Sequence, residues 1–79
     1  MITRLHMLRG GDRAVVREIC GDHEVRQRLS SHGLHPGDAV QVLRAAFLMG
    51  PMLIEIHGVA VALGRGQAEA VEVELPELP

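Results

Sequence analysis

Apolar and polar residues alternate along much of the chain, a pattern typical of short β-strands with one buried and one solvated face. The clearest case is segment 71–75, in which two valines and a leucine alternate with two glutamates. Segments 40–42, 54–56 and 59–63 alternate in the same way, and segment 13–20 is rich in Val and Ile. His57-Gly58 separates two of these segments and predicts a hairpin turn with positive φ at both positions.

Residues 22–31 break this alternation and predict a helix. Asp22 suits an N-cap, Val25 and Leu29 stand one helical turn apart, and Gly33 suits the left-handed position just beyond a helix end. Some five short strands and one short helix predict a mainly β fold, a small and partly open barrel.

Composition narrows the class of protein. The chain has 79 residues, a formal net charge of −2, and eight arginines offset by ten acidic residues. Phe47 is the single aromatic residue, so base-stacking platforms are absent and no nucleic-acid partner is expected. A lone cysteine, Cys20, excludes an internal disulfide framework, and we expect it to be buried and inert at the end of its strand.

The ends of the chain and its apolar stretches indicate a cytoplasmic protein. The first eight residues lack the apolar core of a secretory signal. No stretch approaches the roughly 18 apolar residues of a transmembrane helix, so no membrane insertion is expected.

The sequence shows no arrangement of residues that is typical of a catalytic site. Cys20 shows no sign of an activated thiol, and Gly64-Arg65-Gly66 indicates a turn rather than a phosphate-binding loop. Glu72 and Glu74 are explained as the solvated face of the last strand. We therefore do not expect an enzyme.

The five histidines raise the question of a metal site. His32 and His35 flank a Gly-Leu pair, and Glu55 and His57 stand two residues apart on one predicted strand. Imidazole and carboxylate groups are suitable ligands for Zn²⁺ and Fe²⁺. No spacing here matches a known metal motif, and His57 is equally well explained as a turn residue. His6 and His23 are expected to face solvent.

Residues 45–52 form an apolar loop without a single charge. Gly-Pro at positions 50 and 51 places the tip near Leu48 and Met49, and clustered exposed apolar side chains mark contact surfaces. In the alternative arrangement, Phe47 and Met52 fold back to cap the barrel. Either arrangement satisfies the pattern.

Four stretches of the chain resemble the FeoA family. They are Leu5-x-x-Leu8-x-x-Gly11; Gly11-x-x-Ala14-x-Val16; Arg28-Leu29-x-x-x-Gly33-Leu34-x-Pro36-Gly37; and Pro51 through Gly58 to Leu63, ending in Ala68-x-x-Val71-x-Val73. The third stretch is the most specific. The resemblance implies an SH3-like barrel formed by residues 1–79 as one domain, with a core of about residues 5–75.

Several of these matched positions have structural explanations. Gly33 ends the helix, Pro36-Gly37 turns the chain, and Leu29 and Leu34 plug the open end of the barrel. The Arg28 guanidinium is expected to lie along the barrel at its rim. The positions interpreted as structural are Gly11, Arg28, Leu29, Gly33, Leu34, Pro36, Gly37 and Gly58.

The family resemblance also implies a function. It indicates a non-enzymatic cytosolic accessory protein of bacterial ferrous-iron uptake, which docks on the cytoplasmic domain of a FeoB-type transporter and modulates it. No cofactor is required, and weak self-association is compatible with this role. The candidate contact residues are Phe47, Leu48 and Met49 in the loop and Arg26 on the helix. The chain departs from the family pattern at His32, Phe47 and Gly64, so contacts at these positions do not follow from resemblance.

A second function remains open. The chain is also similar to the SH3-like domain appended to iron-dependent repressors, which suggests a metal-responsive module that binds Fe²⁺ or Zn²⁺ directly. Its candidate ligands are His32, His35, Glu55 and His57. The chain lacks the helical DNA-binding part of such a repressor.

Overall fold

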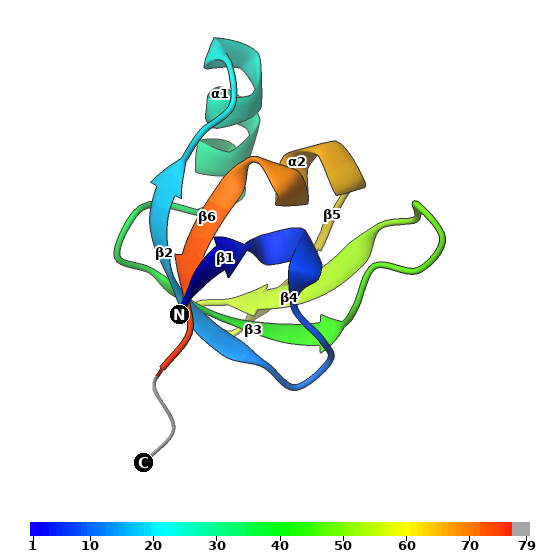
Figure 1. Ribbon diagram of the computed structural model, residues 1–79. Coiled ribbons are helices and arrows are strands. Elements are labelled where there is room, and N and C mark those ends of the chain that lie inside the picture. Colours follow the sequence, from blue (N-terminus) through cyan, green and yellow to red (C-terminus); the bar gives the residue numbers. More distant parts are fainter. Residues whose placement is uncertain (77–79) are drawn as a thin grey trace.

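Six strands, one more than the alternation predicted, form a single antiparallel sheet in the computed structural model, which describes residues 1–76. The strands are β1 (Ile2–Arg4), β2 (Arg13–Ile19), β3 (Ala39–Arg44), β4 (Met52–Ile56), β5 (Val59–Leu63) and β6 (Val71–Glu74). Their order across the sheet is β1-β6-β2-β3-β4-β5, and the sheet curls around a common interior (Figure 1). The mainly β fold class is confirmed. The missed strand, β1, has only three residues and therefore too short an alternation to detect.

Two α-helices and a short 3₁₀ turn connect the strands. Helix α1 (His23–Ser31) begins after Asp22, whose carboxylate accepts a hydrogen bond from the Val25 N–H at 2.9 Å. The 3₁₀ turn covers Leu5–Met7. The second helix, α2 (Arg65–Glu69), contradicts the expectation that Gly64-Arg65-Gly66 is only a turn. Its five residues make little more than one turn, so its sequence carries no helical periodicity. No helix in the described part of the chain is long and apolar enough to cross a membrane.

The core lies between the inner face of the curled sheet and side chains from all three helical segments. Alternate residues of the strands point inward, as the pattern predicted. Leu29 and Leu34 are fully buried, in keeping with the expected role as a plug. The buried residues are Leu5, Leu8, Ala14, Val16, Leu29, Leu34, Val40, Val42, Met52, Ile54, Ile56, Leu63, Ala68, Val71 and Val73.

A β-bulge in β2 overturns the expectation for Cys20. The pairing of β2 with β6 shifts its register between Val16 and Glu18, so one extra residue separates the two inward-facing halves of the strand. Ile19 consequently faces the core, and Cys20 is exposed. Uninterrupted alternation from Val16 would have placed Cys20 inside.

Two further side chains differ from expectation. Arg28 does not lie along the barrel: its guanidinium is exposed and contacts Glu24, one turn earlier on α1, at 3.7 Å. His6 is half-buried rather than solvent-facing, because the 3₁₀ turn packs against α2, and its Nδ1 is buried without a hydrogen-bond partner among the described residues. His23 is exposed, as expected.

The turns follow the glycine positions. Positive φ values occur at Gly11, Gly33, Gly37 and Gly58. At the end of α1, Gly33 has a φ of 86°, which a residue with a Cβ adopts only at a cost. The β4–β5 hairpin turns at His57 and Gly58 with φ values of 52° and 79°, as predicted.

Candidate functional site

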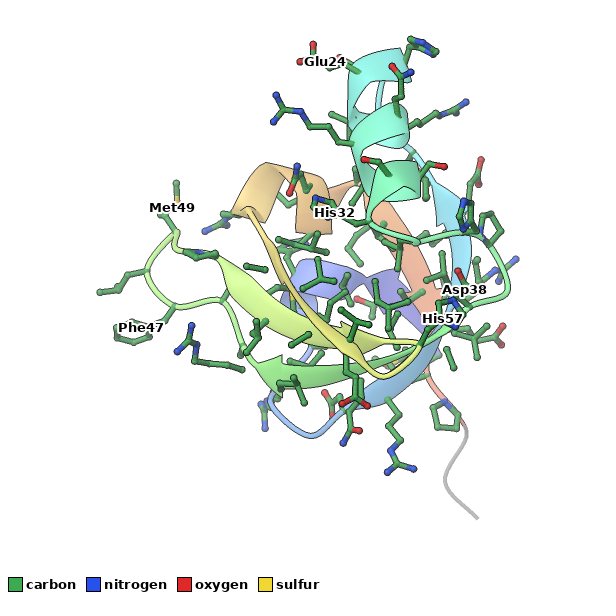
Figure 2. The ribbon with its side chains drawn as sticks, turned by 180° about the vertical axis from the view of Figure 1, so that it is seen from behind. Glu24, His32, Asp38, Phe47, Met49 and His57 are labelled. Carbon is green, nitrogen blue, oxygen red and sulfur yellow. The ribbon has the colours of Figure 1, made fainter. Side chains whose placement is uncertain are left out.

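The apolar loop between β3 and β4 presents three large side chains to solvent. Phe47 is 76% exposed, Leu48 82% and Met49 73%. Figure 2 shows the labelled Phe47 and Met49 on the loop at the edge of the molecule. Met52, at the start of β4, is buried in the core. Of the two arrangements that the sequence left open, the exposed one is therefore found for Phe47. We call Phe47–Met49 the apolar tip.

The backbone of the apolar tip is strained. The Gly50 N–H donates to the Phe47 carbonyl at 2.8 Å, which closes a four-residue turn with Leu48 and Met49 at its centre. Both central residues have positive φ, 48° and 70°, as a type I′ turn requires. Such turns normally use Asn or Gly, because the left-handed region costs an ordinary L-residue about 1–2 kcal/mol. A Cβ on Gly50 would lie 2.9 Å from the Phe47 carbonyl oxygen, so this close approach requires glycine.

Helix α2 anchors the apolar tip to the barrel. The Arg65 Nη1 donates to the Met49 sulfur at 2.9 Å, and the Nε of the same guanidinium donates to Glu69 at 2.9 Å. The hydrogen bond from Arg65 holds the pKa of the Glu69 carboxyl below its usual value. The tip is thus an apolar group with the ion pair of Arg65 and Glu69 beside it. Sequence reasoning did not identify Arg65, because its helix was missed.

Arg26, the fourth candidate contact residue, lies elsewhere. It is exposed on α1 and lines a small groove with Glu18, Ile19 and Pro36. Figure 1 and Figure 2 both show α1 well separated from the loop between β3 and β4. The structure therefore does not join Arg26 and the apolar tip into one surface.

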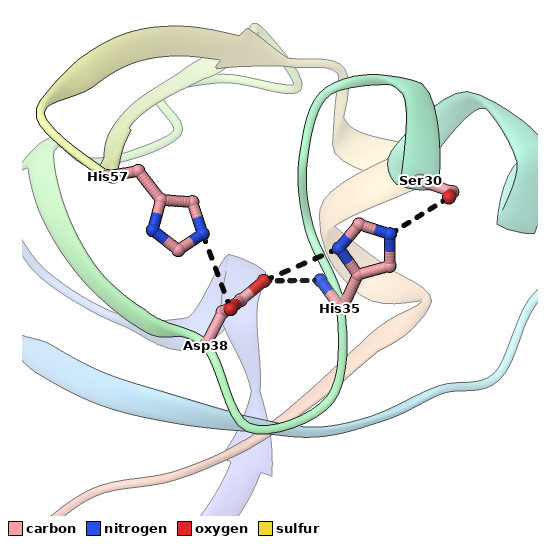
Figure 3. A network of polar contacts seen from close by, with 4 residues as sticks. All are labelled: Ser30, His35, Asp38 and His57. Atoms are coloured by element: carbon pink, nitrogen blue, oxygen red, sulfur yellow. Dashed lines mark hydrogen bonds and ion pairs between the residues drawn. The ribbon is translucent and has the colours of Figure 1, made fainter.

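A separate polar cluster surrounds Asp38 (Figure 3). The His57 Nε2 lies 3.3 Å from Oδ1, and the His35 Nδ1 lies 3.6 Å from Oδ2. The His35 backbone N–H also donates to Oδ2 at 2.8 Å, and the other ring nitrogen of His35 lies 3.0 Å from the Ser30 hydroxyl. The carboxylate thus connects the turn before β3 with the β4–β5 hairpin, and the His35 ring extends the network to the end of α1.

These contacts lower the pKa of the Asp38 carboxyl. The largest cause is the backbone hydrogen bond from His35, and the charges of His57 and His35 act in the same direction. Both imidazole side chains are more than half exposed, whereas Asp38 is only 19% exposed. The cluster is therefore a largely covered carboxylate with two solvent-exposed imidazoles around it.

The remaining metal candidates are not brought into this cluster. His32 is exposed and makes no side-chain hydrogen bond or ion pair with residues 1–76. Glu55 is exposed and shares a groove of 750 Å³ with His57, over β2, β3 and β4. Within residues 1–76, the one group of three potential ligand atoms close to one another is formed by Glu18, Cys20 and Glu72. The bulge in β2 creates this group, and sequence alternation alone could not reveal it.

Comparisons with known proteins agree on one family. The FeoA domain model matches residues 3–75. Over 64 residues, the chain is 34% identical to "Putative Fe(2+) transport protein A" of Methanocaldococcus jannaschii, and the match covers 81% of this chain and 76% of that protein. Most of the length of both proteins is therefore compared.

Solved structures give the same answer. The crystal structure of an iron uptake regulatory protein, FeoA, superposes with a TM-score of 0.87 and is 42% identical, covering 92% of this chain and 96% of that one. A manganese-dependent transcriptional repressor superposes with a TM-score of 0.85 at 25% identity, and the match covers 95% of this chain but only 42% of the repressor. The SH3-like fold that the resemblance implied is confirmed. The chain belongs to the FeoA family, non-enzymatic proteins linked to ferrous-iron transport.

Proposed function

We propose that this protein is a cytoplasmic accessory component of ferrous-iron uptake, which docks through the apolar tip on the cytoplasmic domain of the ferrous-iron transporter and modulates it. The observation that carries the proposal is the combination of exposure and strain at Leu48 and Met49. Their side chains are not buried in the fold, and their backbone conformation opposes folding. Such residues are explained when they serve a contact outside the chain.

The chemistry of the tip indicates the kind of pocket it fits. Phenylalanine, leucine and methionine side chains supply apolar area, and methionine adapts to irregular surfaces. Arg65 stands beside Met49 with its guanidinium already oriented by Glu69. The complementary site on the transporter is therefore an apolar pocket with a polar rim that faces the Arg65–Glu69 ion pair.

Binding to the isolated cytoplasmic domain of the transporter tests this proposal. Leu48→Glu combined with Met49→Glu should weaken binding at least tenfold, because two apolar anchors become charged. The fold should persist, since both side chains are exposed and Glu has the same backbone preference as Leu and Met. The ¹⁵N spectrum of the double variant verifies this.

A matched variant separates the two candidate surfaces. Arg26→Glu changes a charge on α1, far from the tip, and should leave the affinity unchanged. If Arg26→Glu weakens binding while the loop variant does not, docking occurs through α1 and the proposed role of the tip is wrong.

A second candidate function, direct binding of Fe²⁺ or Zn²⁺, is supported by the cluster around Asp38. Its two nitrogen–oxygen separations, 3.3 and 3.6 Å, are close to those between ligands that share one tetrahedral ion, roughly 3.3 Å for metal bonds of about 2.0 Å. The related repressor, of which this fold matches 42%, is named as manganese-dependent. The exposed imidazoles of His35 and His57 would have to rotate towards one point to complete the site.

Titration with Zn²⁺, or with Fe²⁺ without oxygen, tests this candidate. Side-chain ¹⁵N signals of His35 and His57 should shift together, and Asp38→Asn should weaken binding at least tenfold. His32→Gln is the control and should have no effect. Shifts confined to residues around Glu18, Cys20 and Glu72 would instead locate the ion at the bulge of β2.

A further inference from the structure

Strand β5 has one partner and one free edge. It pairs with β4 along its whole length, and it is the last strand in the order of the sheet (Figure 1). In the part of the chain that the structure describes, no backbone or side-chain group forms a hydrogen bond with the other edge of residues 59–63. The other terminal strand of the sheet, β1, has only three residues.

The hairpin geometry determines which backbone groups lie on the free edge. The two-residue turn makes Ile56 and Val59 a hydrogen-bonded pair, and such pairs alternate along an antiparallel ladder. The N–H and C=O groups of Val59, Val61 and Leu63 therefore point towards β4. Those of Ala60 and Ala62 point away from it, so four strong hydrogen-bonding groups face outward.

The side chains of β5 do nothing to protect this edge. Natural edge strands are usually shielded by charged residues, by proline or by a bulge. The sequence Val59-Ala-Val-Ala-Leu63 has no charge and no proline, and its register with β4 is regular throughout. Ala60 and Ala62 are exposed, and Val59 remains 60% exposed although it belongs to the inward-facing set.

The same five residues complement a second copy of themselves. When two β5 strands run antiparallel with Val61 at the centre, Ala60 of each chain faces Ala62 of the other, and Val59 faces Leu63. In this register the Ala60–Ala62 pairs are hydrogen-bonded pairs, so each of the four outward-facing groups on both strands finds a partner. No like charges meet, and the small alanines leave the outer face unobstructed.

We infer that the free edge of β5 pairs with the β5 edge of a second copy of this chain, in the two-fold register centred on Val61. Two-fold pairing uses the same surface on both copies and closes after two, so it yields a dimer rather than a fibre. Each copy contributes only one short strand to the contact. The surface area buried between the two copies is therefore far below the roughly 1,200 Å² at which standard stable interfaces begin. The dimer should therefore be reversible and should form at the high concentrations used for NMR.

Two double variants that differ at a single position test the register. Both carry Ala60→Lys, which places a lysine opposite Glu55 on β4 and therefore keeps the monomer stable. In the first, called the opposite-charge variant, the second substitution is Ala62→Glu, and the dimer gains a lysine–glutamate pair at each of its two Ala60–Ala62 positions. In the second, called the like-charge variant, the second substitution is Ala62→Lys. The dimer of this variant has a lysine–lysine pair at each of the two Ala60–Ala62 positions.

Sedimentation equilibrium gives the dimerisation constant of each variant. The like-charge variant should dimerise roughly tenfold more weakly than the opposite-charge variant, because two cross-strand pairs change from attraction to repulsion. In the wild-type protein, amide exchange at Ala60 and Ala62 should slow as the concentration rises. A wild-type protein that remains monomeric at millimolar concentration, or equal dimerisation of the two variants, would overturn the inference.

Discussion

Asp38 shows how a single residue connects parts of this fold that are distant in sequence. Its carboxylate accepts the His35 N–H and contacts two imidazoles, and its pKa is lowered as a result. A carboxyl with a lowered pKa in the folded state stabilises the protein above the pKa it has in the unfolded chain. This stabilisation is lost as the pH falls through the lowered folded value.

Asp38→Asn should therefore destabilise the protein in a pH-dependent manner. Urea unfolding of the wild type and the variant should differ at about pH 5–6, above the unfolded pKa of about 3.9, and the difference should diminish as the pH falls through the lowered folded pKa, where the wild-type carboxyl also becomes neutral. The asparagine oxygen still accepts the His35 N–H, so the change removes the charge and leaves the turn intact.

Asp12→Asn is the matched control. Asp12 accepts a backbone N–H of the same spacing, from Arg9 at 2.8 Å, and has no imidazole contact among residues 1–76. If both variants show the same pH dependence, the histidines do not contribute to the effect at Asp38.

Two turns of the chain have positive φ at both central residues, and residue type explains why the sequence predicted this conformation for only one of them. The turn at His57-Gly58 was predicted because glycine between two alternating segments is a strong hairpin signal. The turn at Leu48-Met49 also has positive φ at both central residues, but neither leucine nor methionine is a residue type that favours positive φ. The sequence located the tip of the loop, yet the strain at the tip became visible only in the structure.

At the scale of elements, alternation predicted the long strands and failed where the chain leaves regular geometry. Segments 40–42, 54–56 and 59–63 lie within β3, β4 and β5, because a period of two is diagnostic when one face is buried. The bulge in β2 changes this period once, which reversed the expected orientation of Cys20 and assembled Glu18, Cys20 and Glu72. A bulge has no composition signal of its own.

Short elements determined how much of the candidate site could be predicted. The apolar tip was identified from its lack of charge, but its anchor, Arg65, lies on a helix of only five residues. In the Asp38 cluster, His35 and His57 were identified as candidates with His32 and Glu55, since all four are possible ligands. Asp38 itself was missed, because its contact with His57 depends on how the hairpin packs against the turn before β3.

At the scale of the whole molecule, the candidate functions use different surfaces. The apolar tip and Arg65 lie at one end of the β3–β4 hairpin, whereas Asp38 and His57 lie at the other end of the barrel (Figure 2). Strand β5 runs between these two ends, because His57 precedes it by two residues and Arg65 follows it by two. The substitutions proposed for docking, metal binding and dimerisation alter different residues, so the three functions can be tested one at a time.

At the apolar tip, the stability of the whole fold and the proposed binding of a partner make opposite demands on residue 48. Leu48→Gly should stabilise the protein by roughly 0.5–1 kcal/mol, because glycine adopts positive φ without strain and this gain exceeds the greater entropy of its unfolded chain. The same variant should bind the cytoplasmic domain of the transporter more weakly, since it lacks the leucine side chain. Urea unfolding and a binding titration measure the two effects.

Leu48→Ala provides the comparison that makes this prediction specific. Alanine removes the same apolar side chain but remains strained at a φ of 48°, so it should weaken binding as glycine does and leave the stability near that of the wild type. Opposite signs for stability and binding in the glycine variant would show that leucine is kept at this position for a contact outside the chain. A glycine variant that binds as tightly as the wild type, or that is less stable, would show instead that the Leu48 side chain serves the fold itself.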